Sequence, residues 1–489
     1  MRSFFKKHLH ISYVAPLFIY VAAAIARFAA SPYLQPVYDE VAYSSTSLRI
    51  ASSGEWFNIY GSDDLFFFPP LFKWFGAIFV SAGFERLQAV RSVTILLSSG
   101  IPAVLYLLLR KSGLDVKTSF AASFIWIVFP GVTHYSIAGQ VETPFIFFVF
   151  LSLLFFLKRN ENSTLNIILS AIFFSMAVWI KETPFGFVPV FVLIMLQNRE
   201  FKAIGKWCLT ILFLIFPLLI QSFLPHNYDM FFELSNDNIT WGSISFIKPF
   251  TNMGELAGVT ANLPGWLFIL LNVVVSSVFI SGAVYCFIKY RHIELIRFSL
   301  LSLLIFIPFF ALFPKKFHYY LLPVLLLFLI CLSFAFFKDK KWIVVSSILV
   351  LLLSFNGLAH TKTVLDVNYQ SSLSIISRLE AENPAVTASI VSPTPELIRY
   401  IAEKRGLYVA FAGIDFTSRK DGRKCMEKKD RCILDHDYYI TDDMFFEVIF
   451  CKTWPIKIEN CDIEAMKYVI SNTELLISSG GCRLYKVVK

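Results

Sequence analysis

Residues 36–40 (Pro-Val-Tyr-Asp-Glu) directly follow the first hydrophobic span of the chain, and residues 68–71 (Phe-Pro-Pro-Leu) lie further along the same loop. Asp39 and Glu40 place two adjacent carboxylates at the end of an apolar segment, where an uncompensated charge is costly. The pair therefore indicates a reaction centre at a membrane surface. Acids in a loop are usually solvated, and this simpler interpretation stays open for both residues.

The composition is that of a membrane protein. Of the 489 residues, 56% are hydrophobic and only 16% are charged, whereas soluble domains carry about 25% charged residues. A helix needs about 20 apolar residues to cross a bilayer. We predict an all-α polytopic protein with about eleven transmembrane helices, at 11–30, 88–110, 117–134, 143–157, 165–181, 184–197, 204–224, 264–288, 296–313, 317–337 and 341–358.

Basic residues gather in alternate turns, which predicts that these turns and the N-terminus face the cytoplasm. They are Arg110, Lys111, Lys117, Lys158, Arg159, Arg199, Lys202, Lys206, Lys289, Arg291, Arg297, Lys338, Lys340 and Lys341. The net charge of +9 is then matched by anionic lipid headgroups, and no nucleic acid is expected as a partner. We expect a multi-pass protein, in the plasma membrane of a prokaryote.

The C-terminal part differs in composition. We predict a transmembrane domain over residues 1–359 and a small extracytoplasmic α/β domain over residues 360–489, with strand-like segments at 388–391 and 438–440 and a helix-like stretch at 395–404. Five cysteines lie in this tail, and disulfides are expected there ahead of free thiols or a metal site. They are Cys425, Cys432, Cys451, Cys461 and Cys482.

The loop between the first two spans is too long and too patterned for a simple connector. Apolar residues among Ser and Thr predict a short helix over 41–53, ended by Gly54. Pro69-Pro70 predicts the start of a second, aromatic helix over 71–80. Two helices lying in the membrane interface would roof a cavity between the first spans.

Further charged residues fall at the predicted outer ends of spans. Glu142 precedes Pro144, and an acid at a helix N-terminus is also explained by the helix dipole. Lys181 ends a span, where a lysine can simply reach the interface. Lys315 and Lys316 precede His318-Tyr319-Tyr320. Cations on the outer face run against the usual charge bias, and phosphate binding is one reason to place them there.

At these residues the chain resembles a known family. Tyr38-Asp39-Glu40, the stretch ending at 53–56 and Pro69-Pro70-Leu71 resemble the first outer loop of the GT-C glycosyltransferases. The resemblance is to glycosyltransferase family 39, the protein O-mannosyltransferases and the aminoarabinose transferases that modify lipid A. Residues 171–184 and 315–323 are similar to later segments of that family, so the resemblance covers residues 10–340.

The resemblance implies a GT-C-like fold and a sugar donor linked to a polyprenyl phosphate at the outer face. Asp39, with Glu40 beside it, would activate the acceptor hydroxyl, and Glu142 would be the second acidic position. The acceptor can be a lipid, a glycan or a protein. The residues implied to bind the donor phosphate are Lys181, Lys315, Lys316 and Lys73, and those implied to bind substrate are His318, Tyr319 and Tyr320.

One position departs from the family pattern. Phe68 stands where the lipid A-modifying relatives carry Lys before Pro-Pro, which disfavours an aminoarabinose donor and leaves Lys73 as the replacement. Both inverting and retaining outcomes fit the residues. An acidic pair can hold a divalent metal, but there is no dedicated ligand cluster, so no metal or cofactor is predicted.

Two other classes of protein fit part of the pattern. A polytopic transporter or lipid flippase also places ionisable groups in its spans, although it usually shows internal repeats and charges near the midplane. A receptor or assembly scaffold would explain the C-terminal tail and leave the first loop unexplained. The clustering of charge at one face favours surface chemistry.

Overall fold

The computed structural model describes residues 2–34, 36, 38–54, 56, 70–222, 265–312, 321–335, 374, 376–378, 389–392, 400, 410–413, 438–442, 473–479 and 482–487. The chain divides into two compact units. The first contains residues 1–34, 46–239 and 244–361, and the second contains residues 35–45, 240–243 and 362–489. Helix α2 (Tyr38–Ser53) is divided between them.

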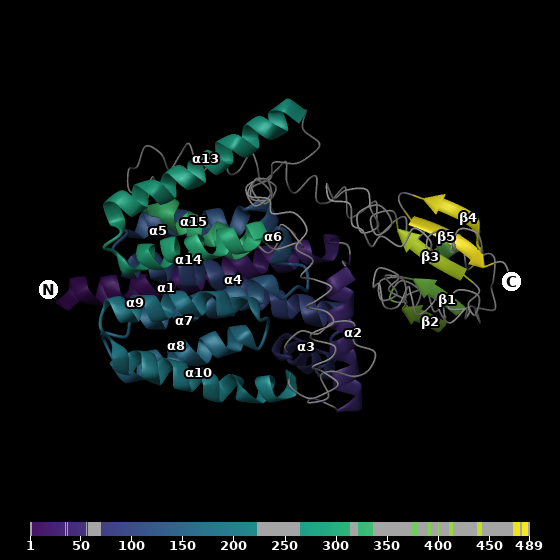
Figure 1. Cartoon of the computed structure of the whole chain (residues 1–489), viewed down its shortest axis with the longest axis horizontal. Coiled ribbons are helices and arrows are strands. Elements are labelled where there is room, and N and C mark those ends of the chain that lie inside the picture. Colours follow the sequence, from purple (N-terminus) through teal and green to yellow (C-terminus); the bar gives the residue numbers. More distant parts are fainter. Residues whose placement is uncertain are drawn as a thin grey trace. The chain divides into compact units, whose positions relative to one another are not determined.

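The first unit is helical (Figure 1). Its described elements are α1 (Arg2–Ala30), η1 (Ser31–Tyr33), α3 (Leu71–Ser81), α4 (Arg86–Lys111), α5 (Val116–Val128), α6 (Pro130–Tyr135), α7 (Glu142–Leu157), α8 (Ser163–Val178), η2 (Thr183–Phe187), α9 (Val188–Gln197), α10 (Phe201–Ser222), α13 (Gly265–Tyr290), α14 (Glu294–Leu312) and α15 (Leu322–Ala335). Helices α1, α4, α7, α8 and α10 pack in that order, each against the next. Helices α13 and α14 both pack on α15, and α9 contacts α10 and α14.

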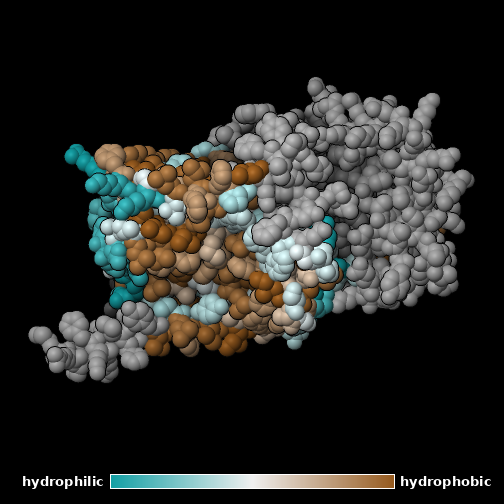
Figure 2. Space-filling model, turned by 90° about the horizontal axis from the view of Figure 1, so that it is seen from below, coloured by the Kyte–Doolittle hydropathy of each residue, from teal (hydrophilic) through white to brown (hydrophobic). Residues whose placement is uncertain are grey.

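The helices suit a membrane by length and composition. Within the described residues, four segments are long and apolar enough to cross one: Val14–Tyr33, Arg86–Lys111, Phe201–Leu218 and Leu270–Tyr290. Large apolar side chains are exposed along α1, α10 and α13, among them Leu17, Phe18, Ile25, Leu209, Phe213, Val273 and Ile288. Figure 2 shows hydrophobic residues over most of the coloured face, with hydrophilic residues gathered at its left end.

Most predicted spans coincide with helices. Each predicted span from 11–30 to 317–337 overlaps a described helix, whereas 341–358 lies outside the described residues, and the number eleven stays a prediction. The prediction of one helix over 117–134 is wrong. The chain leaves helical geometry at Phe129, whose ψ is 127°, and α6 starts at Pro130. A proline disfavours the helical conformation at the residue before it, which explains the break at Phe129.

The two short helices predicted between the first two spans are present. The helix predicted over 41–53 is α2, which starts earlier at Tyr38 and ends before Gly54, with φ of +71°. The helix predicted over 71–80 is α3. It ends in a Schellman motif, since Phe84 N–H donates to Phe79 O across Gly83, with φ of +93°. The Phe79 and Phe84 rings also contact each other, with centroids 5.2 Å apart.

The second unit contains a five-stranded sheet in the order β2-β1-β3-β5-β4. Its strands are β1 (Ser389–Ser392), β2 (Ala410–Gly413), β3 (Tyr438–Asp442), β4 (Thr473–Ser479) and β5 (Cys482–Val487). β1 pairs in parallel with β2 and β3, while β5 pairs antiparallel with β3 and β4. Strands are therefore present at both predicted segments, 388–391 and 438–440.

Other predictions for the tail stay open. Of the predicted helix at 395–404 only Tyr400 is described. Of the five cysteines in the tail, the four other than Cys482 lie outside the described residues. The extracytoplasmic α/β domain, its boundary at 359/360 and its disulfides stay predictions.

Candidate functional site

Glu142 and Lys181 form a buried ion pair. Lys181 Nζ lies 2.6 Å from Glu142 Oε1, and the two side chains are only 4% and 5% exposed. Glu142 is the first residue of α7, and Lys181 follows the C-terminal end of α8. The pair therefore joins the neighbouring ends of two packed helices. A buried charge of one sign is balanced by a buried charge of the other, as low-dielectric surroundings require.

The chain reaches Glu142 through a buried, irregular segment. Residues 136–141 are all buried, and backbone in apolar surroundings must find hydrogen-bond partners within the protein. Helix α4 supplies them, because Thr94 Oγ1 donates to Gln140 O at 3.2 Å and Ser98 Oγ donates to Ser136 O at 3.0 Å. Thr143 Oγ1 donates to the carbonyl of Tyr135 at 3.0 Å. These bonds hold the segment against α4 and so fix the start of α7.

Arg27 is a buried cation near this segment that the sequence analysis did not select. It is 2% exposed, and its Nη1 donates to Ser98 Oγ at 3.2 Å and Ser99 Oγ at 3.1 Å. Arginine near the end of an apolar helix usually extends to the interface, which hides it from sequence reasoning. The adjacent Ser98-Ser99 pair inside the apolar α4 was the available signal.

The acidic pair of the first loop lies at the start of α2. Asp39 is half-buried and Glu40 is fully buried in the first turn of that helix. An acid in the first turn is favoured by the helix dipole. Both residues belong to the second unit, whereas Glu142 and Lys181 belong to the first, so their common site stays a prediction.

Lys73 lies in the first turn of α3 and is completely buried. Ser47 Oγ, in the second half of α2, donates to the carbonyl of Lys73 at 3.1 Å. Gly76 permits this approach, because a Cβ there would lie 2.4 Å from Ser47 Oγ. The backbone around Lys73 is thus held against α2, and its role as a phosphate ligand stays a prediction.

Five of the predicted site residues lie outside the described residues. They are Lys315, Lys316, His318, Tyr319 and Tyr320. Within the part of the chain that is described, no group of three or more His, Cys, Asp or Glu residues could hold a metal ion.

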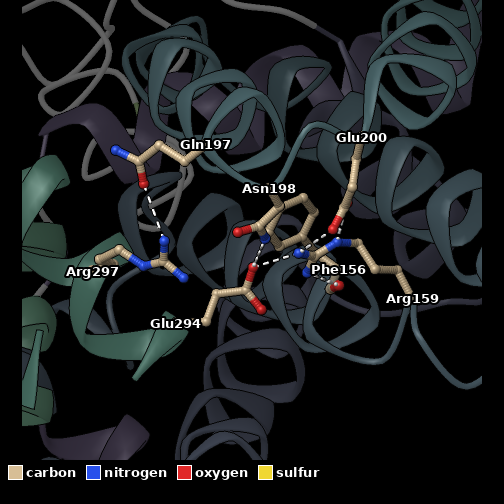
Figure 3. A network of polar contacts seen from close by, with 7 residues as sticks. All are labelled: Phe156, Arg159, Gln197, Asn198, Glu200, Glu294 and Arg297. Carbon is tan, nitrogen blue, oxygen red and sulfur yellow. Dashed lines mark hydrogen bonds and ion pairs between the residues drawn. The ribbon is translucent and has the colours of Figure 1, made fainter. Parts of the chain in front are cut away.

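A second polar network joins three turns at the other end of the helices (Figure 3). The Arg159 guanidinium donates to Glu200 through Nε at 2.6 Å and to Glu294 through Nη2. Asn198 Nδ2 also donates to Glu294, at 3.2 Å. Burial lowers the pKa of Arg159, but the hydrogen bonds and charges of Glu200 and Glu294 outweigh this effect, so the pKa of Arg159 is raised above its ordinary value.

The network brings together turns that the sequence analysis assigned to the cytoplasmic side. Arg159 follows α7, Glu200 precedes α10 and Glu294 starts α14. Lys111, the last residue of α4, also pairs with Glu161 in the turn that holds Arg159. These basic turns therefore share one end of the helices, while Glu142 and Lys181 lie at the opposite ends of α7 and α8.

Comparison with known proteins identifies the fold. Residues 68–221 match the family model of dolichyl-phosphate-mannose-protein mannosyltransferases. No curated protein matches the chain significantly. ArnT from Cupriavidus metallidurans in the apo state is similar with a TM-score of 0.60 at 13% identity, over 96% of this chain and 97% of that one. The structure of ArnT bound to undecaprenyl phosphate also gives a TM-score of 0.60, at 12% identity and the same coverage.

A second similar structure is the oligosaccharyltransferase of Archaeoglobus fulgidus in complex with Zn and sulfate. Its TM-score is 0.53 at 15% identity, over 98% of this chain and 73% of that one. Identities this low establish a shared fold only. The resemblance predicted from the loop between the first two spans is confirmed: the chain has the GT-C fold and is similar to glycosyltransferase family 39, whose dolichyl-phosphate-mannose-protein mannosyltransferase model it matches over residues 68–221.

Proposed function

We propose that the chain is an integral-membrane glycosyltransferase that moves a sugar from a polyprenyl-phosphate donor to an acceptor hydroxyl at the outer face. The observation that carries the proposal is the buried Glu142–Lys181 ion pair. It lies inside the segment that matches the mannosyltransferase family model. Intramembrane ionisable pairs of this kind are costly to keep and commonly mark functional sites.

The similar structures support the class of donor and acceptor. ArnT was solved with undecaprenyl phosphate, and the Archaeoglobus oligosaccharyltransferase was solved tethered to an acceptor peptide. A polyprenyl-linked sugar as donor and a hydroxyl of an envelope lipid, glycan or protein as acceptor follow by analogy. The apolar surfaces of α1, α10 and α13 suit contact with lipid tails.

The reaction is a single displacement. The acceptor oxygen attacks the anomeric carbon and loses its proton to a carboxylate, for which Asp39 is the candidate, while the bond from that carbon to the phosphate oxygen breaks. The leaving polyprenyl phosphate takes the bonding electrons. We assign Lys181 the role of offsetting the charge that develops there, and one well-placed electrostatic contact contributes about 3 kcal/mol. Lys73, Lys315 and Lys316 are further candidates for this role.

In this scheme Glu142 keeps Lys181 in place before the donor arrives. Its carboxylate balances the ammonium group in the buried site, so the lysine can stay charged without water. When the donor phosphate binds, Lys181 gains a further anionic partner. Glu142 is also the second acidic position near the substrate.

The test is transfer by the purified full-length protein in lipid nanodiscs. With a radiolabelled polyprenyl-phosphate sugar and an envelope extract as acceptor, we expect label to move to the acceptor. Asp39→Asn should lower the rate at least about a hundredfold, the usual contribution of a general base. Asp115→Asn is the matched control, since Asp115 caps α5 and takes no part in the proposed chemistry.

Transport is the alternative, and the same purified protein reconstituted into proteoliposomes decides it. If proteoliposomes move a solute or lipid while Asp39→Asn changes nothing, the proposal is wrong. Where transfer is observed, mass spectrometry of envelope lipids and glycans from a deletion strain identifies the acceptor by the sugar that it lacks.

A further inference from the structure

Arg27 is a buried charge whose hydrogen bonds are only partly accounted for. Its Nη1 contacts Ser98 and Ser99, whereas its Nε and Nη2 have no hydrogen-bond acceptor among the described residues. Within that part of the chain no carboxylate forms an ion pair with it. An arginine buried in the last turn of an apolar helix is costly, so its location calls for a specific role.

The contacts of Ser98 connect Arg27 to the segment that precedes Glu142. Ser98 Oγ accepts from Arg27 Nη1, and its own proton can go to Ser136 O at 3.0 Å or to Ile95 O at 3.3 Å. A charged donor polarises the hydroxyl that accepts from it, which strengthens that hydroxyl as a donor in turn. Arg27 therefore strengthens the bond that holds the carbonyl of Ser136 against α4.

The held segment is short and leads directly to the ion pair. Thr94, one turn before Ser98 on α4, fixes the other end of the segment at the carbonyl of Gln140. Glu142 follows two residues later and contacts Lys181. Any shift of residues 136–140 along α4 would therefore move Glu142 relative to Lys181.

We infer that Arg27 is a positioning residue for the Glu142–Lys181 pair, acting through Ser98 and the carbonyl of Ser136. The inference rests on the proposed function for its effect on the donor, because the pair is the proposed phosphate site. Arg27 itself need not touch the donor. Loss of the link lets residues 136–140 move and weakens phosphate binding without removing any charge from the pair.

Ser98→Ala tests the inference without disturbing the bond from Arg27 to Ser99. Ser152→Ala is the matched control, because Ser152 is also a fully buried serine, and its Oγ donates to Ser170 O at 2.7 Å between α7 and α8. Each variant loses the buried hydrogen bonds of one serine hydroxyl, so the unfolding temperatures of the two should fall by similar amounts. A merely structural role for Ser98 predicts no further difference between them.

Two readouts on the full-length protein in nanodiscs separate the variants. Hydrogen exchange of the amides at 136–141 should rise about tenfold in Ser98→Ala and stay at the wild-type rate in Ser152→Ala. The Kd for undecaprenyl phosphate should rise about tenfold in Ser98→Ala alone, a change that corresponds to about 1.4 kcal/mol. Arg27→Met should reproduce both changes, and Arg27→Lys should lie between it and wild type.

Equal exchange and equal Kd in the two serine variants would overturn the inference. Where Arg27→Met does not fold, Ser98→Ala decides alone. If the wild-type protein binds no undecaprenyl phosphate, the proposed function fails, and the exchange comparison still shows whether Ser98 holds the segment.

Discussion

Single residues show how strongly burial determines the effect of a substitution here. Glu142 and Lys181 are 5% and 4% exposed and 2.6 Å apart, so replacing one removes the charge that balances the other in this buried pair. Glu142→Gln should lower the free energy of unfolding by about 3 kcal/mol or more. Chemical unfolding of the detergent-purified protein measures the difference.

A double replacement separates stability from function. Glu142→Leu combined with Lys181→Met removes both charges, so stability should return to within about 1–2 kcal/mol of wild type. Sugar transfer should not return, because the phosphate ligand is gone. Glu161→Gln, at the exposed pair with Lys111, is the control and should change stability little. A double variant as unstable as Glu142→Gln would contradict this account of the pair.

Candidate site residues can be selected from the sequence where a charged residue falls beside an apolar span. Glu142 and Lys181 stood out for that reason, and the structure pairs them. Arg27 was not selected, because an arginine in the last turn of a span is normally explained by the interface. Its burial depends on how α1 packs on α4, and no local pattern in the sequence encodes that packing.

At the scale of elements, close packing of α4 on α7 depends on Gly100. A Cβ there would lie 2.2 Å from Phe147 Cε2, so Gly100→Ala should destabilise the protein by about 1–3 kcal/mol through overpacking. Gly205, inside α10, has no atom within 4 Å of such a Cβ. Gly205→Ala should therefore stabilise by up to about 1 kcal/mol through helix propensity. Thermal unfolding of the two variants in parallel should give shifts of opposite sign.

The start of α5 depends on a cap whose strength varies with pH. The Asp115 carboxylate accepts from Thr118 N–H at 3.0 Å and from Thr118 Oγ1 at 2.8 Å. Burial raises its pKa, but these hydrogen bonds lower it by more, so the pKa of the Asp115 carboxyl lies below its ordinary value. A lowered folded-state pKa stabilises the protein above the unfolded-state value and loses that contribution as the pH falls through the folded-state value.

Asp115→Ala should therefore cost about 1 kcal/mol at pH 7, and the gap to wild type should close as the pH falls below about 4. Asp115→Asn keeps a cap that does not ionise, so the stability of this variant should lack the part of the pH dependence that comes from protonation of Asp115. Unfolding measured between pH 3 and 7 distinguishes the variants. A gap between wild type and Asp115→Ala that is independent of pH would show that ionisation of Asp115 does not matter.

Element positions were largely predictable, and their breaks less so. The helices at 38–53 and 71–81 follow from a glycine stop and a Pro-Pro start in the sequence. The span predicted over 117–134 looked continuous because hydropathy is insensitive to one proline. The break at Phe129-Pro130 arises because proline disfavours helical geometry at the preceding residue. After the break, α6 leads into the buried segment before Glu142.

For the whole molecule, charge divides between the two ends of the helices. The basic turns that the positive-inside rule assigns to the cytoplasm meet at one end, around Arg159 and Lys111. The Glu142–Lys181 pair lies at the other ends of α7 and α8. The sequence therefore predicted which turns share a side, since that follows from counting spans. It could not predict which turns contact each other, since that depends on the packing of α9 and α14.

Arg159 connects helices inside and outside the segment that matches the family model, residues 68–221. It joins the turns beside α7 and α10, which lie within that segment, to α14, which lies beyond it. Arg159→Gln would leave Glu200 and Glu294, whose side chains are 25% and 21% exposed, as neighbouring carboxylates without their cation. We expect a loss of about 2–3 kcal/mol in unfolding free energy, which is less than for a fully buried pair because water still reaches both acids. Arg159→Lys should lower the unfolding free energy by less, since lysine keeps the charge but cannot donate to Glu200 and Glu294 as the guanidinium does.

Lys111→Gln, at the exposed pair in the same turns, is the control for Arg159→Gln and should stay within about 0.5 kcal/mol of wild type. Chemical unfolding gives the free energies, and limited proteolysis reports where the helices open first. If α14 depends on the network, new cleavage should appear at the turn before Glu294 in Arg159→Gln alone. Equal unfolding curves for the two variants would mean that apolar packing of α9 and α14 holds these helices without the ion pairs.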